Sequence, residues 1–301
     1  MLLSEFEFKE NELLLSDAEF DVLGFLDDDF ADKGLSFLGG KHFIRQTQNK
    51  KLSCVITRKE FVDKLPKHIL GIVISECPEC TFWRFHSIIG ALQKKVDFPT
   101  QIGKECKISP LSYISSRNVI IGDNVTIEEF VTIKENTFVG KDTIIHSNAV
   151  IGAELEQFSV SETGDRSIAR HYGGVTIGEG VFVGSLAIVA KSIFYGTATK
   201  IGNNAVIGSK TFISHGCVIQ NRAVIEGDAH IAGGTILQSG AIVGPQSFVS
   251  NKLQIGQGAN VTAGSVLTKN LGEGEVYWNG QIIKKERYDA IKMSAVIRRK
   301  S

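Results

Sequence analysis

The sequence predicts a mainly β fold, in which a left-handed parallel β-helix of hexapeptide repeats at 101–272 follows a small α/β domain at 1–100. Two observations predict it. An aliphatic residue recurs at every sixth position along most of the chain after residue 120, and small or polar residues stand between these positions. A six-residue period fits neither an α-helix, with its period of about 3.6, nor the alternation of a hairpin strand. It fits a coil in which three hexapeptides make one triangular turn.

The repeat is most regular in the last third of the chain. From Ile201, eleven successive hexapeptides begin with Ile, Leu or Val, as in IGNNAV, ISHGCV and IAGGTI. The same phase runs from Ile121 and from Ile177, and Tyr195 is the one first residue that is not aliphatic. Strands of neighbouring coils lie about 4.8 Å apart, so residues separated by three hexapeptides are expected to lie above one another on one outer face.

The phase breaks once. The separation between Ile151 and Ile177 is not a multiple of six, and the segment between them is polar and contains glycine. We therefore expect an excursion at about 154–174. Loops of this length are usually functional or disordered, and a lid or substrate-gripping role is the favoured interpretation.

The N-terminal region, 1–100, has strand-like runs at 54–58 and 71–75 and helical stretches at about 60–66 and 82–93. Phe37 and Phe43 flank a Gly39-Gly40 pair, where backbone could approach a flat ligand. Packing of both rings in the core is the alternative.

The C-terminal segment, 273–301, is expected to be a basic tail or helix that covers the end of the β-helix. From residue 284 onward it has a surplus of five positive charges, which would suit an acidic partner or ligand phosphates; a solvated helix end is the alternative. The basic residues are Lys284, Lys285, Arg287, Lys292, Arg298, Arg299 and Lys300, and the acidic ones are Glu286 and Asp289.

Composition excludes several classes of protein. Lys and Arg together number 33, as do Asp and Glu. The chain therefore has no net positive charge that would attract nucleic acid. No apolar run approaches the roughly 20 residues of a membrane span. The five cysteines, an odd number without regular spacing, and the lack of a signal pattern favour a reducing cytoplasm. The CxxC pair Cys77 and Cys80 supplies only two of the four ligands that structural zinc requires.

His215 is the strongest candidate for chemistry. It occupies the third position of its hexapeptide, which is an outward position near a corner, where an accessible imidazole would titrate near neutral pH and could act as a general base. Gly233 stands three hexapeptides later, so its backbone N–H would lie about 5 Å away on the same face and could hold an oxyanion. A surface histidine without a role is the alternative.

The other histidines do not predict a metal site. None of the seven forms an i, i+4 pair with another, and no two in the repeat region stand one full coil apart. A zinc enzyme on this scaffold would need a convergent histidine cluster, so no metal and no tightly bound cofactor are expected.

The segment ISHGCVIQNRAVIEGDAHIAGG, at 213–234, resembles the left-handed β-helix acyltransferases. The runs LSFLGGKHF at 35–43, CVITRKEF and GIVISECP, with IGAE at 151–154 and GGVTIG at 173–178, resemble the UDP-3-O-acylglucosamine N-acyltransferases. That resemblance implies His215 as the catalytic base and Gly233 as the oxyanion glycine. It also implies Phe37 and Phe43 as rings that stack on uracil, while Gly40 falls where that family has the asparagine that reads the base.

The resemblance implies an N-acyltransferase of cell-envelope glycan or lipopolysaccharide synthesis. The acceptor would be a nucleotide-linked amino sugar, with UDP or dTDP, and the donor an acyl thioester of coenzyme A or of an acidic acyl carrier protein. A homotrimer is the expected assembly. The alternatives are the UDP-3-O-acylglucosamine N-acyltransferase of lipid A synthesis itself and a non-catalytic nucleotide-sugar-binding scaffold.

Overall fold

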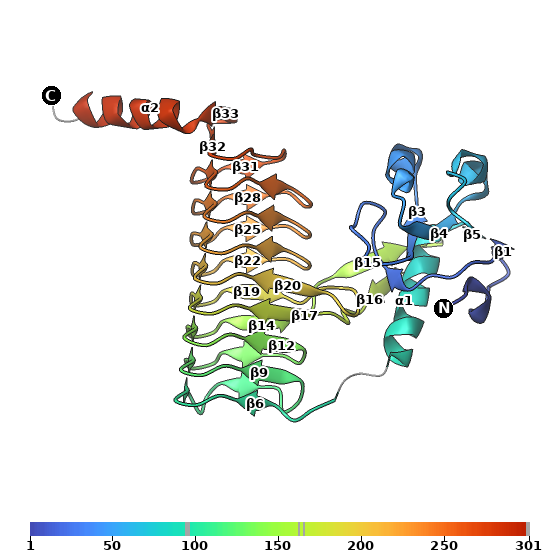
Figure 1. Ribbon diagram of the computed structural model, residues 1–301, viewed down its shortest axis with the longest axis horizontal. Coiled ribbons are helices and arrows are strands. Elements are labelled where there is room, and N and C mark those ends of the chain that lie inside the picture. Colours follow the sequence, from blue (N-terminus) through green and yellow to red (C-terminus); the bar gives the residue numbers. More distant parts are fainter. Residues whose placement is uncertain (94–96, 162, 165, 299–301) are drawn as a thin grey trace. The chain divides into compact units, whose positions relative to one another are not determined.

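The computed structural model describes residues 1–93, 97–161, 163–164 and 166–298 (Figure 1). The chain forms two units: Met1–Lys94 with Glu156–Arg170, and Lys95–Leu155 with His171–Ser301. The predicted fold class, a left-handed parallel β-helix with a small N-terminal α/β domain, is confirmed.

The first unit is a five-stranded sheet with the order β1-β5-β4-β3-β2, in which β1 alone runs antiparallel to its neighbour. Its helix α1 packs against β3, β4 and β5. The strands and helices predicted at 54–58, 71–75, 60–66 and 82–93 correspond to β4, β5, η3 and α1. The bounds are β1 Glu12–Ser16, β2 Val22–Leu23, β3 Gly34–Leu38, β4 Leu52–Thr57, β5 Gly71–Ser75, α1 Pro78–Leu92, and the 3-10 helices η1 Leu3–Glu5, η2 Lys41–Gln48 and η3 Lys59–Lys64.

The excursion predicted at 154–174 contains an antiparallel hairpin of β15 (Gln157–Val160) and β16 (Arg166–Ala169). The hairpin packs against α1, with Ser159 and Ala169 buried, and therefore belongs to the first unit. The middle of the excursion is thus regular structure, whereas the sequence indicated only an irregular loop.

The second unit coils through three parallel sheets in turn. Sheet 1 contains β7 Lys107–Ile108, β10 Thr126–Ile127, β13 Ile144–Ile145, β18 Phe182–Val183, β21 Val206–Ile207, β24 Val224–Ile225, β27 Ile242–Val243, β30 Asn260–Val261, β32 Glu275–Trp278 and β33 Gln281–Lys284. Sheet 2 contains β8 Tyr113–Ile114, β11 Thr132–Ile133, β14 Val150–Ala153, β19 Ile188–Ala190, β22 Phe212–Ile213, β25 His230–Ile231, β28 Phe248–Val249 and β31 Val266–Leu267. Sheet 3 contains β6 Gln101–Ile102, β9 Val119–Ile121, β12 Thr137–Val139, β17 Gly174–Ile177, β20 Ala198–Ile201, β23 Val218–Ile219, β26 Ile236–Leu237 and β29 Gln254–Ile255.

The hexapeptide pattern explains this coil. The aliphatic residue of each unit points inward, and Ile207, Ile225 and Val243 stack on one another without exposure. The glycine that often follows lies against the next coil: a Cβ atom added at Gly208 would lie 2.5 Å from the backbone N of Gly227. Neighbouring coils can therefore approach to strand-pairing distance.

Two insertions change the regular register of three hexapeptides within the coil, and smaller departures of one or two residues occur at its two ends. Val139 pairs with Ile177, well beyond the regular partner position, because the excursion lies between them. Val183 pairs with Ile207, one hexapeptide further along than the regular register, because residues 191–196 bulge out between β19 and β20. The prediction that Tyr195 begins a regular hexapeptide is therefore wrong. The bulge has the length of one hexapeptide, so it leaves the six-residue phase of the sequence intact.

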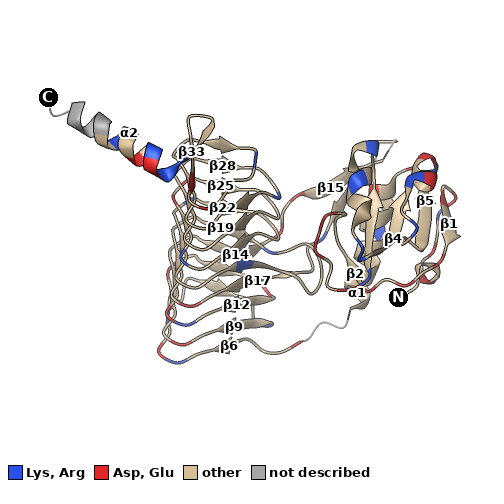
Figure 2. Cartoon of the chain, turned by 45° about the horizontal axis from the view of Figure 1, so that its top comes forward, with Lys and Arg blue, Asp and Glu red and all other residues tan. Residues whose placement is uncertain are grey.

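A β-hairpin, and not only the predicted basic tail or helix, stands at the C-terminal end of the β-helix. The antiparallel strands β32 and β33 extend sheet 1, and Tyr277 packs against the aliphatic core. Helix α2 (Lys285–Arg298) follows β33, and basic and acidic residues alternate at its start (Figure 2). Arg299 and Lys300 of the predicted tail lie outside the described residues. No helix in the described part of the chain has the length and apolarity that a bilayer crossing requires.

Candidate active site on one edge of the β-helix

His215 lies in a turn from sheet 2 to sheet 3, between β22 and β23. We call the line formed by these turns, coil after coil, the 2–3 edge. Two hydrogen bonds from backbone N–H groups fix this turn. The N–H of Ser214 donates to the carbonyl of Ile231 at 2.9 Å, and the N–H of Gly216 donates to the side-chain Oγ1 of Thr199 at 2.9 Å. Gly216 has a φ of +66°, a conformation that favours glycine. The turn therefore holds the imidazole at the corner.

Gly233 lies directly above His215, as the spacing of three hexapeptides predicted. The N–H of Gly234 donates to the carbonyl of His215 at 2.9 Å, and a Cβ atom added at Gly233 would lie 2.5 Å from Cε1 of His215. The imidazole thus fills the space that a side chain at Gly233 would need. Among the described residues, the N–H of Gly233 has no hydrogen-bond acceptor, so it remains available to a ligand.

The imidazole is less accessible than the sequence suggested. Burial and, to a lesser extent, the positive charge of Lys252 lower the pKa of His215 to about 4. The prediction that His215 titrates near neutral pH is therefore wrong. At pH 7 the ring is neutral, which is the form in which an imidazole accepts a proton.

A second histidine, His171, lies beside His215, with ring centroids 5.9 Å apart and planes inclined by 58°. Although two coils separate them, the bulge at 191–196 and the returning end of the excursion bring them together. The N–H groups of Tyr172 and Gly173 donate to the carbonyls of Ile193 and Ser192, at 2.8 and 3.1 Å. His171 is only 2% exposed.

Gly173 and Gly174 make this close approach possible. A Cβ atom at Gly173 would lie 2.7 Å from two carbonyl oxygens of the bulge and from that of Thr197, and one at Gly174 would clash with the carbonyl oxygen of Asn136. Any larger residue would push the excursion away from the coil, so the Gly-Gly pair fixes His171 next to His215.

An ion pair with a buried lysine and a half-exposed glutamate supports the same region. Lys191 Nζ lies 2.9 Å from Glu154 Oε1, and the lysine side chain is 5% exposed. Although burial raises the pKa of Glu154, the Lys191 hydrogen bond and charge outweigh it, with a contribution from His171, and the net pKa is lowered. Glu154 ends the coil before the excursion and Lys191 begins the bulge, so the pair joins the two insertions.

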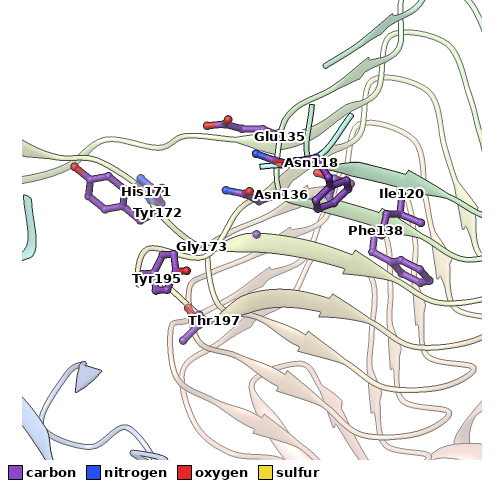
Figure 3. Close-up of a pocket in the computed structure, with 14 residues that line it drawn as sticks. Asn118, Ile120, Glu135, Asn136, Phe138, His171, Tyr172, Gly173, Tyr195 and Thr197 are labelled. Carbon is purple, nitrogen blue, oxygen red and sulfur yellow. Dashed lines mark hydrogen bonds between the residues drawn. The ribbon is translucent and has the colours of Figure 1, made fainter. Parts of the chain in front are cut away.

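A pocket of about 330 Å³ opens on the 2–3 edge beside His171 (Figure 3). Its walls come from the segments before β6, β9, β12, β17 and β20 and from the first residues of β9, β12 and β17, so both insertions contribute to it. Figure 3 shows the amide ends of Asn118 and Asn136 side by side, with His171 and Tyr195 across from them. The lining residues are Phe98, Asn118, Ile120, Glu135, Asn136, Thr137, Phe138, His171, Tyr172, Gly173, Gly174, Tyr195, Gly196 and Thr197.

The two rings predicted to hold a nucleotide base lie on different elements of the first unit. Phe37, on β3, packs against Phe82 and Trp83 of α1, with centroids 5.1 and 6.4 Å apart, which is the core-packing alternative. Phe43, on η2, is 42% exposed and contacts His42. Gly40 precedes η2 as its N-cap residue and has an extended backbone. No ring contact joins Phe37 and Phe43 within the described residues, and their role in base stacking stays a prediction.

Sequence reasoning missed His171, the bulge and one covalent bond. His171 stands two residues before the Gly-Gly pair at which the six-residue phase resumes, and Tyr195 is the one non-aliphatic first position; together these were the available signals. Cys77 and Cys80, at the start of α1, are joined by a disulfide, which the sequence did not predict.

In the described part of the chain, no three His, Cys, Asp or Glu side chains converge as a metal site would require.

No protein-family model and no curated protein matches the chain. Solved structures are similar in fold. LpxA from Bacteroides fragilis, a UDP-N-acetylglucosamine acyltransferase, is 21% identical over 61% of this chain and 69% of that one, with a TM-score of 0.53. Another UDP-N-acetylglucosamine acyltransferase structure is 20% identical over 66% of this chain and 75% of that one, with a TM-score of 0.56. At these identities the similarity shows a shared fold.

Because the charge of Lys252 contributes to the low pKa of His215, Lys252→Gln should raise that pKa above about 4. The value should stay below 6.5, the ordinary histidine value, because burial is the larger cause. NMR titration of the His215 Cε1 proton measures the shift. Lys210→Gln, in a turn from sheet 1 to sheet 2, is the control and should change nothing. An identical His215 titration in the wild type and Lys252→Gln would contradict the assigned cause.

Proposed function

We propose that this protein is an N-acyltransferase, which moves an acyl group from a thioester to the amino group of a nucleotide-linked amino sugar. The observation that carries the proposal is the stack of a neutral, half-buried imidazole, His215, beneath the backbone N–H of Gly233, which has no acceptor among the described residues. Such a pair provides the two elements that acyl transfer needs, a base and an oxyanion donor. The two solved structures are named UDP-N-acetylglucosamine acyltransferases, which supports acyl transfer to a nucleotide-linked sugar; the free amino group as the acceptor is part of the proposal.

In this mechanism the amine nitrogen attacks the thioester carbonyl, and His215 accepts the proton that the nitrogen loses. The N–H of Gly233 donates to the carbonyl oxygen as it becomes an oxyanion. The carbon–sulfur bond then breaks, the amide remains, and the thiolate leaves with the proton from His215. A base with a pKa of about 4 is neutral at pH 7 and, once protonated, returns its proton readily to a thiolate.

The remaining substrate contacts belong to the same proposal. The nucleotide base would stack on Phe43, with Phe37 and Gly40 as further base contacts. The donor would be acyl-CoA or an acyl carrier protein, which the positive surplus of the segment from residue 284 onward could attract. The reaction would belong to cell-envelope glycan or lipopolysaccharide synthesis in the cytoplasm.

We also propose a homotrimer, built around the turns from sheet 1 to sheet 2. Leu111 and Phe130 lie on successive turns, Leu186 lies two turns beyond Phe130 with Asn148 on the turn between them, and the three are 57%, 59% and 50% exposed. Phe130 and Leu186 have φ values of +60° and +61°, where most other turns of the coil have Asn, Asp or Gly. Bulky residues in this conformation are strained by about 1–2 kcal/mol, and such strain persists mainly where function requires it. Burial against other copies would offset this strain.

The catalytic assignment predicts a loss of rate without a loss of fold. His215→Ala should lower kcat by about 10²–10⁴-fold. Gly233→Ala should lower it roughly 100-fold, because the new Cβ displaces the imidazole. The control is Gly227→Ala, at the same position of the preceding hexapeptide, where the nearest atom is a carbonyl oxygen 3.1 Å away.

Mass spectrometry of UDP- and dTDP-linked amino sugars incubated with a panel of acyl thioesters gives the readout. A wild type that acylates none of them favours a non-catalytic scaffold. A wild type specific for UDP-3-O-acylglucosamine is the lipid A enzyme itself. A His215→Ala variant that keeps most of the wild-type rate refutes the base assignment.

The assembly is tested by Phe130→Asn combined with Leu186→Asn. The double variant should be monomeric by light scattering, while its melting temperature shows a folded chain, because asparagine tolerates a positive φ. Ile102→Asn, which replaces an exposed residue on sheet 3, is the control and should stay trimeric. A trimeric double variant would exclude these turns from the interface.

A further inference from the structure

We infer that the pocket on the 2–3 edge is the subsite for the sugar ring of the acceptor. The inference rests on the proposed acyltransferase and gives it a place for the amino sugar. It starts from continuity: His171 lines the pocket on one side, and its ring lies 5.9 Å from His215 on the other. The pocket therefore lies close to the base, with the ring of His171 between them.

The chemistry of the walls fits a hexose. The rings of Phe138 and Tyr195 are 42% and 41% exposed and offer flat apolar faces on which the C–H groups of a sugar can pack. Asn118 and Asn136 offer amide groups to hydroxyls. The amide oxygen of Asn118 accepts the N–H of Phe98 at 3.0 Å, and its NH₂ group has no acceptor within the described residues, although the residue is only 6% exposed. Figure 3 shows both amides turned into the pocket.

The volume of the pocket and its polar walls exclude the nucleotide and the acyl chain from it. Ligand pockets span roughly 300–1,000 Å³, so a volume of about 330 Å³ accommodates one ring and not a complete nucleotide sugar. An acyl chain in the pocket would leave the amides of Asn118 and Asn136 without hydrogen-bond partners, which is unfavourable. The nucleotide and the acyl chain must therefore lie outside.

The pocket is also preformed. The returning excursion and the bulge are joined by backbone hydrogen bonds, including that from the N–H of Gly174 to the carbonyl of Thr197 at 2.9 Å. The ion pair of Glu154 and Lys191 joins the same two insertions. Walls held in this way bind a ring without the entropy cost of first ordering a loop.

The test compares ligands with and without the sugar. Wild type, Asn136→Asp and Tyr195→Ala are titrated with UDP and dTDP and with UDP- and dTDP-linked hexosamines, by calorimetry. Asn136→Asp keeps a residue that tolerates the φ of +60° but removes an amide donor. Its matched control is Asn204→Asp, an exposed residue with a φ of +55° in a turn from sheet 3 to sheet 1.

The wild type should bind the nucleotide sugar more tightly than the nucleotide. Asn136→Asp and Tyr195→Ala should weaken only the nucleotide sugar, by about tenfold or more, and raise the KM for the acceptor while the KM for the thioester is unchanged. Asn204→Asp should behave as the wild type.

The failures can be told apart. If the wild type acylates amino sugars but both pocket variants keep the acceptor KM and the nucleotide-sugar affinity, the pocket is not the sugar subsite and the acyltransferase proposal stands. If the wild type acylates no amino sugar, the acyltransferase proposal fails and this inference with it.

Discussion

The inward stacking of aliphatic side chains is the constraint on which the rest of the second unit depends. Each coil must place three such residues inside, and the coil above must repeat them at strand-pairing distance, as Ile207, Ile225 and Val243 do. Turns are therefore superimposed as strictly as strands are. A histidine at one corner and a glycine one full coil later must meet, because the core between them leaves no other register.

The site owes its remaining features to the places where this register is relaxed. The excursion and the bulge both leave the coil between sheet 2 and sheet 3, at successive turns, and they are joined by the bond from Tyr172 to Ile193. An insertion at a turn does not interrupt the stack of aliphatic side chains inside the coil. The core therefore tolerates both, while the 2–3 edge gains a pocket and a second imidazole that a regular coil would lack.

The coil, the strands and the pair of His215 and Gly233 could be predicted from the sequence, because each follows from a fixed spacing. His171 could not, since its position depends on how far the excursion returns, and no period records that distance. The bulge at 191–196 was hidden for a related reason: an insertion of one hexapeptide preserves the phase, and only Tyr195 marked it. The burial of His215 was also missed, because it comes from His171 and Gly233 together and not from its own hexapeptide.

Burial of His215 determines what kind of base it can be. An exposed imidazole would be partly protonated near neutral pH, and it would then repel the ammonium form of an amino sugar. Desolvation and the charge of Lys252 keep the ring neutral instead. The same desolvation strengthens the interaction of the Gly233 N–H with a developing oxyanion, because a hydrogen bond is stronger where water is excluded. Desolvation at the 2–3 edge, where the ring of His171 lies beside that of His215, thus contributes both to the low pKa of the base and to the strength of the oxyanion donor.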